Sequence, residues 1–505
     1  MRTIHVIVFK NLGLILQVNG ILNIIPVVFA FVLGEEPQAI AILLASFVSL
    51  AGGFFFSNLR GQERADYASL SILAVVSFIV LGAIGSIPYL YLHDNLFPNA
   101  SFLTKLVVSY FESISAMTTT GLTVFDPATL PQSIIFYRAV TQWLGGVGIV
   151  FFILLFLNVP GTYARVLEAF GGYTKLAPTA RGTYLRIIRI YGMYTVLFAI
   201  LLVTLGFMEP FSAVIVSLTG ISTGGMLHTG NLAAELSPVG FWIVIILMIA
   251  GATSFPIHER VWNRKIRGVF STEFKTFVAY LIAISMLIII ANSGNWGDTG
   301  NIIFHVISAA STTGFQFIAL DTLSPLVRLL LTVTMFMGGC TFSTAGGMKV
   351  IRMIIAFRSI PWLIRNNVLP NSAITLVKIG KNSFFDKEIA FALTMVFAGA
   401  VSVLATSAVI TIGGYSFLNS LFESVSAFAT TGLSAGVTSL HLPNYAKVAL
   451  IVEMIVGRLE VIPVLITGKA LYTYLIRKEI IKTMLVQKQE LLQRARIRPA
   501  KFSEV

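Results

Sequence analysis

The sequence contains very little cysteine and very little charge. Its 505 residues include one cysteine, Cys340, which excludes a disulfide framework and any cysteine-rich zinc or iron–sulfur site. Charged residues make up 11% of the chain, whereas soluble domains usually contain about a quarter. With 56% apolar residues, a water-soluble fold would have too little polar surface to cover its core. The same composition excludes a disordered chain.

Motifs for nucleotide hydrolysis and for metal-dependent proteolysis are also missing. The chain has no G-x-x-x-x-G-K-[ST] loop and no H-E-x-x-H pair, and its 6 histidines are scattered. Ser343 has no neighbouring base in the sequence, and His258 falls in a loop that we expect to be cytoplasmic. An intramembrane enzyme is therefore disfavoured, and direct ATP hydrolysis by this chain is not expected.

Ten long apolar runs account for much of the sequence. A helix needs about 20 residues to cross the hydrocarbon core, and continuously apolar runs predict helices rather than a β-barrel. The runs lie at 12–33, 38–57, 68–92, 134–158, 187–208, 239–256, 277–292, 326–358, 389–412 and 445–476. We therefore predict an all-α polytopic membrane protein whose first two spans form a hairpin.

Basic residues are concentrated on one side of this arrangement. Of the 35 Lys and Arg residues, 27 lie at the N-terminus or in the segments 58–66, 158–190, 258–275, 357–390 and 477–505. The positive-inside rule makes this side cytoplasmic, and ten crossings place both termini there. The net charge of +13 is thus attributed to membrane topology, and no nucleic-acid partner is expected.

The tripeptide [Ser/Thr]-[Ser/Thr]-Gly occurs only four times in the sequence. Each copy follows an apolar stretch too short to cross the membrane, at 101–117, 211–221, 300–311 and 417–429. The first and last copies share a longer element, FESISAMTTTGL and FESVSAFATTGL. One Thr-Thr-Gly is an ordinary helix end, but four copies in step with the hydropathy indicate a repeated unit.

The repeated unit consists of a span, a half-helix, a Ser/Thr-rich turn and a second span. The expected parts are an N-terminal transmembrane hairpin over 1–66, pore repeats over 67–185, 186–272, 273–385 and 386–476, and a basic cytoplasmic tail over 477–505.

Four such turns predict a pathway for a monovalent cation. Non-helical backbone at membrane depth is tolerated only inside protein or beside water. A glycine allows positive φ, so that the preceding carbonyl groups can replace the hydration shell of an ion. The negative end of each half-helix dipole also favours a cation. No carboxylate lies within any of the turns, which disfavours a divalent ion.

These features resemble the TrkH/TrkG/KtrB family of potassium transporters, within the superfamily of K⁺ transporters. The resemblance covers nearly the whole chain, and the N-terminal hairpin is similar to that of TrkH rather than KtrB. It implies a single-chain, pseudo-fourfold pore with K⁺ bound at the four turns and no organic cofactor. The filter residues that it implies are Thr119, Thr120, Gly121, Ser222, Thr223, Gly224, Thr312, Thr313, Gly314, Thr430, Thr431 and Gly432.

The second copy departs most from this pattern, because its half-helix has no Glu-Ser element. Each turn also has one glycine where a strict potassium-channel filter has two around an aromatic residue. This difference predicts looser discrimination of K⁺ from Na⁺.

The third repeat contains two glycine pairs within one predicted span, in MFMGGCTFSTAGGMK at 335–349. A single pair often serves close helix packing, but two pairs around a polar centre favour a break in the helix. The family resemblance implies an intramembrane gating loop here. The residues concerned are Gly338, Gly339, Thr341, Ser343, Thr344, Gly346 and Gly347.

Arg458 lies near the middle of the last predicted span. An arginine inside a membrane costs about 3 kcal/mol on insertion scales and usually faces protein or water. One interpretation is a structural pairing with Glu453 or Glu460. The other, which the family resemblance supports, is a cation below the filter that repels K⁺ and binds carbonyl groups of the loop.

The leading functional prediction is K⁺ uptake across the cytoplasmic membrane, the inner membrane of bacteria, driven by the membrane potential. The resemblance implies a homodimer and a separate cytosolic subunit of the TrkA type, which binds NAD or ATP/ADP and controls the gate. The basic loops would form its docking surface. The alternative is a Na⁺- or H⁺-coupled secondary cation symporter.

Overall fold

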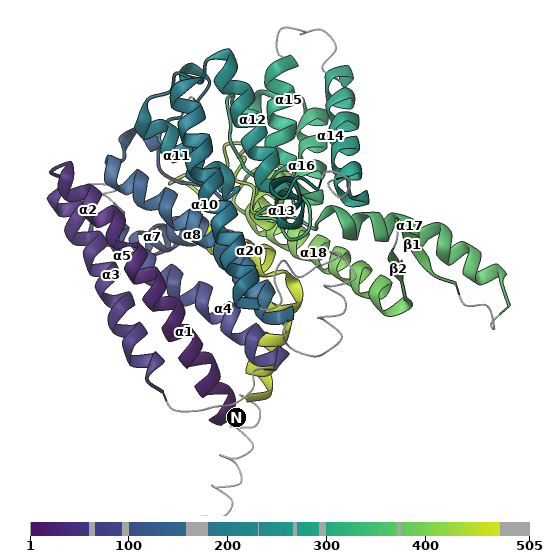
Figure 1. Ribbon diagram of the computed structural model, residues 1–505, viewed down its shortest axis with the longest axis horizontal. Helices are drawn as coiled ribbons and strands as arrows, with labels where there is room; N and C mark the ends of the chain where they lie inside the picture. The colour runs from purple at the N-terminus through teal and green to yellow at the C-terminus, as the bar shows by residue number, and fades with distance from the viewer. Residues whose placement is uncertain are drawn as a thin grey trace, which may run out of the picture.

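The computed structural model describes residues 2–59, 66–92, 100–157, 180–230, 232–265, 270–291, 299–370, 375–380 and 382–474. The predicted tail over 477–505 and most of the predicted basic loop over 158–190 lie outside these residues. The described chain is almost entirely helical, as Figure 1 shows. The prediction of an all-α polytopic membrane fold is confirmed.

The chain begins with a tight helical hairpin at the left edge of Figure 1. It consists of α1 (Arg2–Leu22), α2 (Ile24–Val32) and α3 (Glu36–Ser57). Small residues let the helices approach closely: the Ser46 hydroxyl donates to the Gly20 carbonyl at 2.6 Å, and the Ser49 hydroxyl donates to that of Leu16 at 2.9 Å. Small residues and interhelical hydroxyl bonds are typical of helix contacts in membranes.

The remaining elements follow one order four times: a long helix, a short helix, a turn and a further helix. The first set is α4 (Tyr67–Gly85), α5 (Ile87–Tyr91), α7 (Phe102–Met117), η1 (Pro127–Thr129) and α8 (Gln132–Leu157). The second is α10 (Ala180–Thr204), α11 (Pro210–Ile221), η2 (Leu232–Glu235), α12 (Pro238–Ala252) and α13 (Phe255–Trp262).

The third set is α14 (Thr272–Ala291), α15 (Thr299–Ala310), η5 (Leu320–Thr322), α16 (Pro325–Met337) and α17 (Val350–Val368). The fourth is α18 (Asp386–Ile412), α19 (Phe417–Phe428), α20 (Asn444–Leu459) and a helix over Val461–Tyr474. We refer to these sets as repeats 1 to 4.

Six helical stretches of the described chain are long and apolar enough to cross a membrane unbroken, and the pair α12 and α13, bent by 113°, would be a seventh. Two other predicted spans are interrupted. The span at 326–358 is split between α16 and α17, and the span at 445–476 is split at Glu460. The number of ten crossings therefore remains a prediction.

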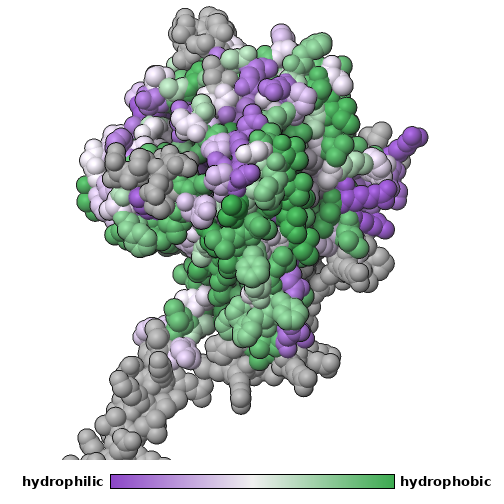
Figure 2. Space-filling model, turned by 90° about the vertical axis from the view of Figure 1, so that its left-hand side faces the viewer, coloured by the Kyte–Doolittle hydropathy of each residue, from purple (hydrophilic) through white to green (hydrophobic). Residues whose placement is uncertain are grey.

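Apolar side chains cover much of the outer surface. In Figure 2 they form a broad green area across the middle of the molecule, with hydrophilic side chains gathered above it. Exposed residues of the N-terminal hairpin such as Val32, Phe47 and Phe54 contribute to the apolar surface. A soluble protein would rarely expose so large an apolar area, whereas a membrane protein requires it.

One described element was not expected from the sequence. Strand β1 (Val377–Ile379) pairs antiparallel with β2 (Asn382–Phe384). The hairpin projects with α17 at the right of Figure 1. Its inward residues Val377 and Phe384 form a small separate core with Ile355 of α17 and Ala392 of α18. The sequence predicts this segment only as part of the basic loop over 357–390.

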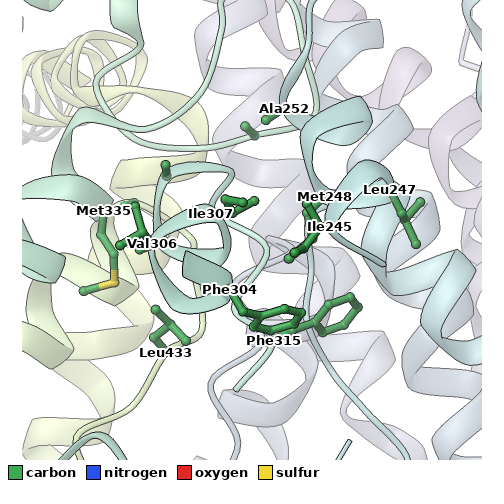
Figure 3. Close-up of a cluster of buried hydrophobic side chains, with 14 of the residues drawn as sticks. Ile245, Leu247, Met248, Ala252, Phe304, Val306, Ile307, Phe315, Met335 and Leu433 are labelled. Atoms are coloured by element: carbon green, nitrogen blue, oxygen red, sulfur yellow. The ribbon is translucent and has the colours of Figure 1, made fainter. Parts of the chain in front are cut away.

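The short helices are packed in an apolar interior. Figure 3 shows Phe304, Val306 and Ile307 of α15 beside residues of α12 and the turn residues Phe315 and Leu433. Phe304 and Phe315 are fully buried. This packing fixes the ends of the short helices and thereby the turns that follow them.

Candidate ion pathway

The four predicted turns share one backbone conformation. Each contains a threonine with positive φ, followed two residues later by a glycine with positive φ. The threonines are Thr119, Thr223, Thr312 and Thr430, with φ between 48° and 55°, and the glycines are Gly121, Gly225, Gly314 and Gly432, with φ between 72° and 93°. A threonine in this region is strained, so the surrounding structure must hold it there.

The four turns form a closed ring. A β-carbon added to each glycine would overlap a carbonyl oxygen of the next repeat, which shows how closely the backbones approach. The contacts run from Gly121 to the oxygen of Gly224, from Gly225 to that of Thr313, from Gly314 to that of Thr431, and from Gly432 back to that of Thr120. Repeats 1, 2, 3 and 4 thus meet in cyclic order. We call Gly121, Gly225, Gly314 and Gly432 the ring glycines.

The second copy requires a correction of one residue. The sequence pattern aligned Ser222, Thr223 and Gly224 with the other three triplets, but the backbone aligns Thr223, Gly224 and Gly225 with them. Ser222 caps α11, as Thr118 caps α7. The pattern misled because Ser-Thr-Gly also fits the motif when it is read one residue too early.

Each turn is fastened to the end of its own short helix. The amide of the residue before the ring glycine donates to a carbonyl inside the helix: Thr120 to Ser115 at 2.9 Å, Gly224 to Thr219 at 2.8 Å, Thr313 to Ser308 at 3.0 Å and Thr431 to Ser426 at 2.9 Å. The helix ends therefore lie at the ring, where the negative ends of their dipoles favour a cation.

Several ring hydroxyl groups have no protein partner. Within the described residues, the side-chain oxygens of Thr119, Thr430 and Thr431 are buried and make no hydrogen bond. Buried polar atoms are normally paired, so unpaired ones at one place suggest a ligand or ordered water. No cluster of three or more His, Cys, Asp or Glu side chains suited to a metal ion occurs in the described part of the chain. The available ligands at the ring are neutral oxygens.

The predicted gating loop lies directly against the ring. The chain is non-helical from 338 to 349, between α16 and α17, with positive φ at Gly338 and Gly347. The Gly346 amide donates to the Thr312 hydroxyl at 2.7 Å, and the Thr344 hydroxyl lies 2.9 Å from the carbonyl oxygens of Ile221 and Gly251. The loop is thus tied to repeats 2 and 3 at the level of the turns.

The other predicted loop residues have identifiable partners. The Thr341 amide donates to the Glu273 carboxyl at 2.6 Å, and the Ser343 hydroxyl donates to the Cys340 carbonyl at 2.6 Å. Gly339 accepts from the Val350 amide at 3.1 Å. Thr341 and Ser343 are buried, so the loop fills the space beneath the ring rather than leaving a broad opening.

Arg458 bridges the loop and repeat 1. Its Nη1 donates to the Thr344 carbonyl at 2.9 Å and its Nη2 donates to the Gly145 carbonyl at 3.0 Å, while only 4% of the residue is exposed. Gly145 itself packs against the Met117 carbonyl at the end of α7. The guanidinium group therefore lies close to the inner side of the ring.

The alternative of a structural ion pair for Arg458 is not found among the described residues. Glu453 accepts hydrogen bonds from Ser402 and Thr406 of α18, each at 2.9 Å. Glu460 instead contacts Arg352 of α17, whose Nη2 lies 2.7 Å from both carboxylate oxygens.

Comparison with known proteins identifies the family. The chain matches the TrkH family model, described as a cation transport protein, over residues 37–291 and 298–472. The chain belongs to the TrkH family. It is 31% identical to an uncharacterized cation transporter of Methanocaldococcus jannaschii over 91% of this chain and 94% of the relative. It is 29% identical to the Trk system potassium uptake protein TrkH of Halomonas elongata over 91% and 97%, respectively.

A solved structure supports the same assignment. The crystal structure of the potassium transporter TrkH from Vibrio parahaemolyticus matches with a TM-score of 0.78 and 25% identity, over 91% of this chain and 97% of that one. The sequence-based resemblance to the TrkH/TrkG/KtrB family is thereby confirmed. The TrkH family consists of transporters, so this chain is not an enzyme.

The turn of repeat 4 contains a pattern that also occurs in hydrolases. Residues 432–436 read Gly-Leu-Ser-Ala-Gly, which matches the G-x-S-x-G pattern of hydrolase nucleophiles. Ser434 lies on the turn after the ring and donates to Glu423, and no histidine of the described chain contacts it. The pattern here belongs to the TrkH fold rather than to a hydrolytic site.

Sequence reasoning missed several residues that hold the ring. Gln142 of α8 donates from Nε2 to the Gly224 carbonyl at 2.6 Å and accepts from the Met226 amide at 3.1 Å. Gln142 carries no motif that would have singled it out. Glu112 and Glu423, by contrast, stand in the duplicated FES element, which was a visible signal.

Proposed function

We propose that this chain carries K⁺ into the cell through the ring of four turns. The observation that carries the proposal is the closed order of contacts from repeat 1 to repeat 4 and back to repeat 1. Such a ring can surround an ion with neutral oxygens, which suits a large monovalent cation. The names of the relatives, potassium uptake protein and potassium transporter, support K⁺ as the transported ion.

The ion-binding residues in this proposal are those of the corrected ring. They are Thr119, Thr120, Gly121, Thr223, Gly224, Gly225, Thr312, Thr313, Gly314, Thr430, Thr431 and Gly432. The unpaired hydroxyl groups at Thr119, Thr430 and Thr431 support this role. The repeat boundaries 67–185, 186–272, 273–385 and 386–476 belong to the same proposal.

The loop from Gly338 to Gly347 acts as the gate in this proposal, with Arg458 as an electrostatic barrier. A cation held beneath the ring raises the energy of K⁺ there. The two hydrogen bonds of Arg458 to Thr344 and Gly145 support a role in holding the loop closed. Opening requires these bonds to break.

The protein is further proposed to work in the cytoplasmic, or bacterial inner, membrane, with both termini in the cytoplasm. It forms a homodimer and is controlled by a cytosolic TrkA-type subunit that binds a nucleotide. The "Trk system" names of the relatives support a multi-component assembly. The excess of Lys and Arg on one side supports the orientation.

Coupling to a second ion is favoured by one observation. Glu453 is a buried carboxyl group in α20 that is held by two hydroxyl groups and has no ion pair among the described residues. Such a group can exchange a proton within a membrane protein. In a coupled symporter, an inward proton gradient would drive K⁺ accumulation without a membrane potential, and Glu453→Gln would abolish that effect.

The test is influx of radioactive Rb⁺ into vesicles that contain only the purified chain. A membrane potential negative inside should drive uptake, and external K⁺ and Cs⁺ should compete more strongly than Na⁺. A chain that passes no monovalent cation under any voltage contradicts the proposal.

A further inference from the structure

Each short helix carries a position nine residues before its ring glycine that faces the backbone beyond the ring. In three repeats this position accepts a hydrogen bond from the amide three residues after the glycine: Glu112 from Val124 at 2.7 Å, His305 from Phe317 at 3.1 Å and Glu423 from Ala435 at 3.2 Å. In repeat 2 the same position is Val216, which has no acceptor. The four repeats are therefore alike in geometry and different in charge.

Repeat 1 is neutral at this position. The Glu112 carboxylate lies 3.4 Å from Nη2 of Arg138, and both side chains are buried. The pair carries no net charge, and its field falls off faster with distance than that of a single charge.

Repeats 2 and 3 place no buried charge there. His305 Nε2 accepts the Phe317 amide, and Nδ1 faces the Asn301 carbonyl oxygen at 2.7 Å and must donate to it. The ring is therefore the neutral tautomer. Glu235 of repeat 2 contacts His228, and its side chain is 34% exposed, so water screens it.

Repeat 4 is the exception. Glu423 is 0% exposed, and Oε1 accepts from the Ser434 hydroxyl and from the amides of Ala435, Val437 and Thr438, while Oε2 accepts from the Thr438 hydroxyl. Burial opposes the charged form of this carboxylate, and the five hydrogen bonds that it accepts favour the charged form. Glu423 makes no ion pair within the described residues.

The buried lysine of the same repeat does not neutralise Glu423 directly. Lys447 Nζ donates to the carbonyl oxygens of Leu440 and Leu442, at 2.9 and 2.7 Å. It lies outside ion-pair distance of the Glu423 carboxylate, which is anchored to the backbone immediately after the ring.

We propose that Glu423 determines the affinity of the outer pore for its monovalent cation, by supplying a fixed negative charge from repeat 4 alone. This inference rests on the proposed function. Because the carboxylate is buried, solvent ions screen it much less than they screen the acidic residues of the outer loops. The negative potential at the K⁺ entry site is then strongest on the side of repeat 4, although the backbone has pseudo-fourfold symmetry.

The substitution Glu423→Gln removes the negative charge and nearly preserves the shape of the side chain. The side-chain oxygen of Gln can replace Oε1 as the acceptor that faces the amides after the ring. Its NH₂ group can donate to the Thr438 hydroxyl oxygen, which now donates to Oε2. The turn after the ring therefore keeps its hydrogen bonds and loses one charge.

The experiment measures the concentration dependence of Rb⁺ influx into vesicles that contain the purified chain. For Glu423→Gln we expect the KM to rise about fivefold, because removal of a buried negative charge next to the ring weakens the binding of a cation there. The maximal rate should stay within about twofold, because the ring itself is unchanged.

Two variants provide controls. Thr438→Val removes a hydroxyl group that holds Glu423 but keeps the charge, so its KM should remain near that of the wild type. Glu423→Asp also keeps the charge and should stay closer to the wild type than Glu423→Gln does. A purely structural role for Glu423 predicts instead that Thr438→Val and Glu423→Gln change transport alike.

A gain of charge tests the inference even if Glu423→Gln fails to fold. His305→Glu places a second carboxylate where the Phe317 amide is already available, and the KM should fall. An unchanged KM in both Glu423→Gln and His305→Glu, with normal wild-type influx, overturns the inference and leaves the proposed function standing. Absence of wild-type influx overturns the proposed function first.

Discussion

At the scale of single residues, the ring depends on glycines whose neighbours leave no space for a side chain. Gly432 has φ +93°, and a β-carbon there would overlap the Thr120 carbonyl oxygen of repeat 1. The strained Thr430, two residues earlier, is held by its own amide, which donates to the Ala427 carbonyl at 3.1 Å. Both the backbone conformation and the close approach exclude other residues in place of Gly432.

Gly432→Ala should therefore abolish Rb⁺ influx. The matched control is Gly414→Ala, because Gly414 has φ +90° but nothing within 4 Å of an added β-carbon. Both variants should lose about 1–2 kcal/mol of stability from the left-handed backbone, but only Gly432→Ala adds a collision at the ring. Equal influx in the two variants would contradict the close approach of repeats 1 and 4.

Arg458→Ala should raise basal influx. The substitution removes both the positive charge beneath the ring and the two hydrogen bonds to Thr344 and Gly145. Arg458→Lys keeps the charge, but its single amino group cannot bond to both carbonyl groups as the guanidinium does. The influx through this variant should therefore fall between those of the wild type and the alanine variant. Flux assays on vesicles measure this order, and no increase in Arg458→Ala would disprove the barrier.

The sequence alone identifies some of the ring residues but not all of them. Three of the four triplets could be placed by pattern, because only one reading of Thr-Thr-Gly is possible in each. Gly224 and Gly225 offered two readings, and only the contacts between repeats decide between them. The partners of Glu453 and Glu460 are fixed by packing over distances in sequence of 47 or more residues, which no local pattern reveals.

At the scale of elements, the interrupted helix of repeat 3 is held in place from several sides. Its loop is bonded to Thr312 at the ring, to Ile221 and Gly251 of repeat 2, and to Arg458 of repeat 4. A further tie joins α17 to repeat 4, where Arg352 contacts Glu460. Movement of the loop must therefore disturb the ring as well.

Thr344→Val should loosen the loop and raise basal influx, though less than Arg458→Ala does. The valine keeps the shape of threonine and loses the hydroxyl group that lies 2.9 Å from two carbonyl oxygens of repeat 2. Leaving buried partners unsatisfied costs about 1–3 kcal/mol.

The control for this substitution is Thr334→Val in α16. Thr334 is equally buried, but its hydroxyl donates only to the Leu330 carbonyl of its own helix. Influx through the Thr334→Val variant should match that of the wild type. If both valine variants leak equally, the contacts of Thr344 do not hold the loop.

The elements themselves were largely predictable, because the long apolar runs and the four Ser/Thr-Gly turns that follow the short apolar stretches are local signals. The β-hairpin was not, since Val377–Ile379 and Asn382–Phe384 are too short to show a clear alternation. The broken helices were visible only where glycine pairs marked the break, as at Gly346 and Gly347. The break at Glu460 has no such marker.

At the scale of the whole molecule, the proposed orientation places the basic segments in the cytoplasm. The four short helices enter from the side opposite the basic segments in the proposed orientation. The negative ends of their dipoles then meet a K⁺ ion that has come from outside.

Labelling of single cysteines tests this orientation. Cys340 is fully buried, so it should not react with an impermeant reagent, and the wild type serves as the unlabelled control. Lys265→Cys should then react with such a reagent only from the cytoplasmic side, and Thr129→Cys only from the outside. Both residues are exposed in the structure. Reversed labelling would invert the proposed direction of the pore.

The central claim is that one polypeptide surrounds a dehydrated monovalent cation with four equivalent turns. Anomalous diffraction from crystals grown with Rb⁺ or Tl⁺ tests it most directly. The account predicts a peak enclosed by Thr119–Gly121, Thr223–Gly225, Thr312–Gly314 and Thr430–Gly432, and its displacement by K⁺. Ordered cation density elsewhere in the molecule, with none inside this ring, would contradict the account.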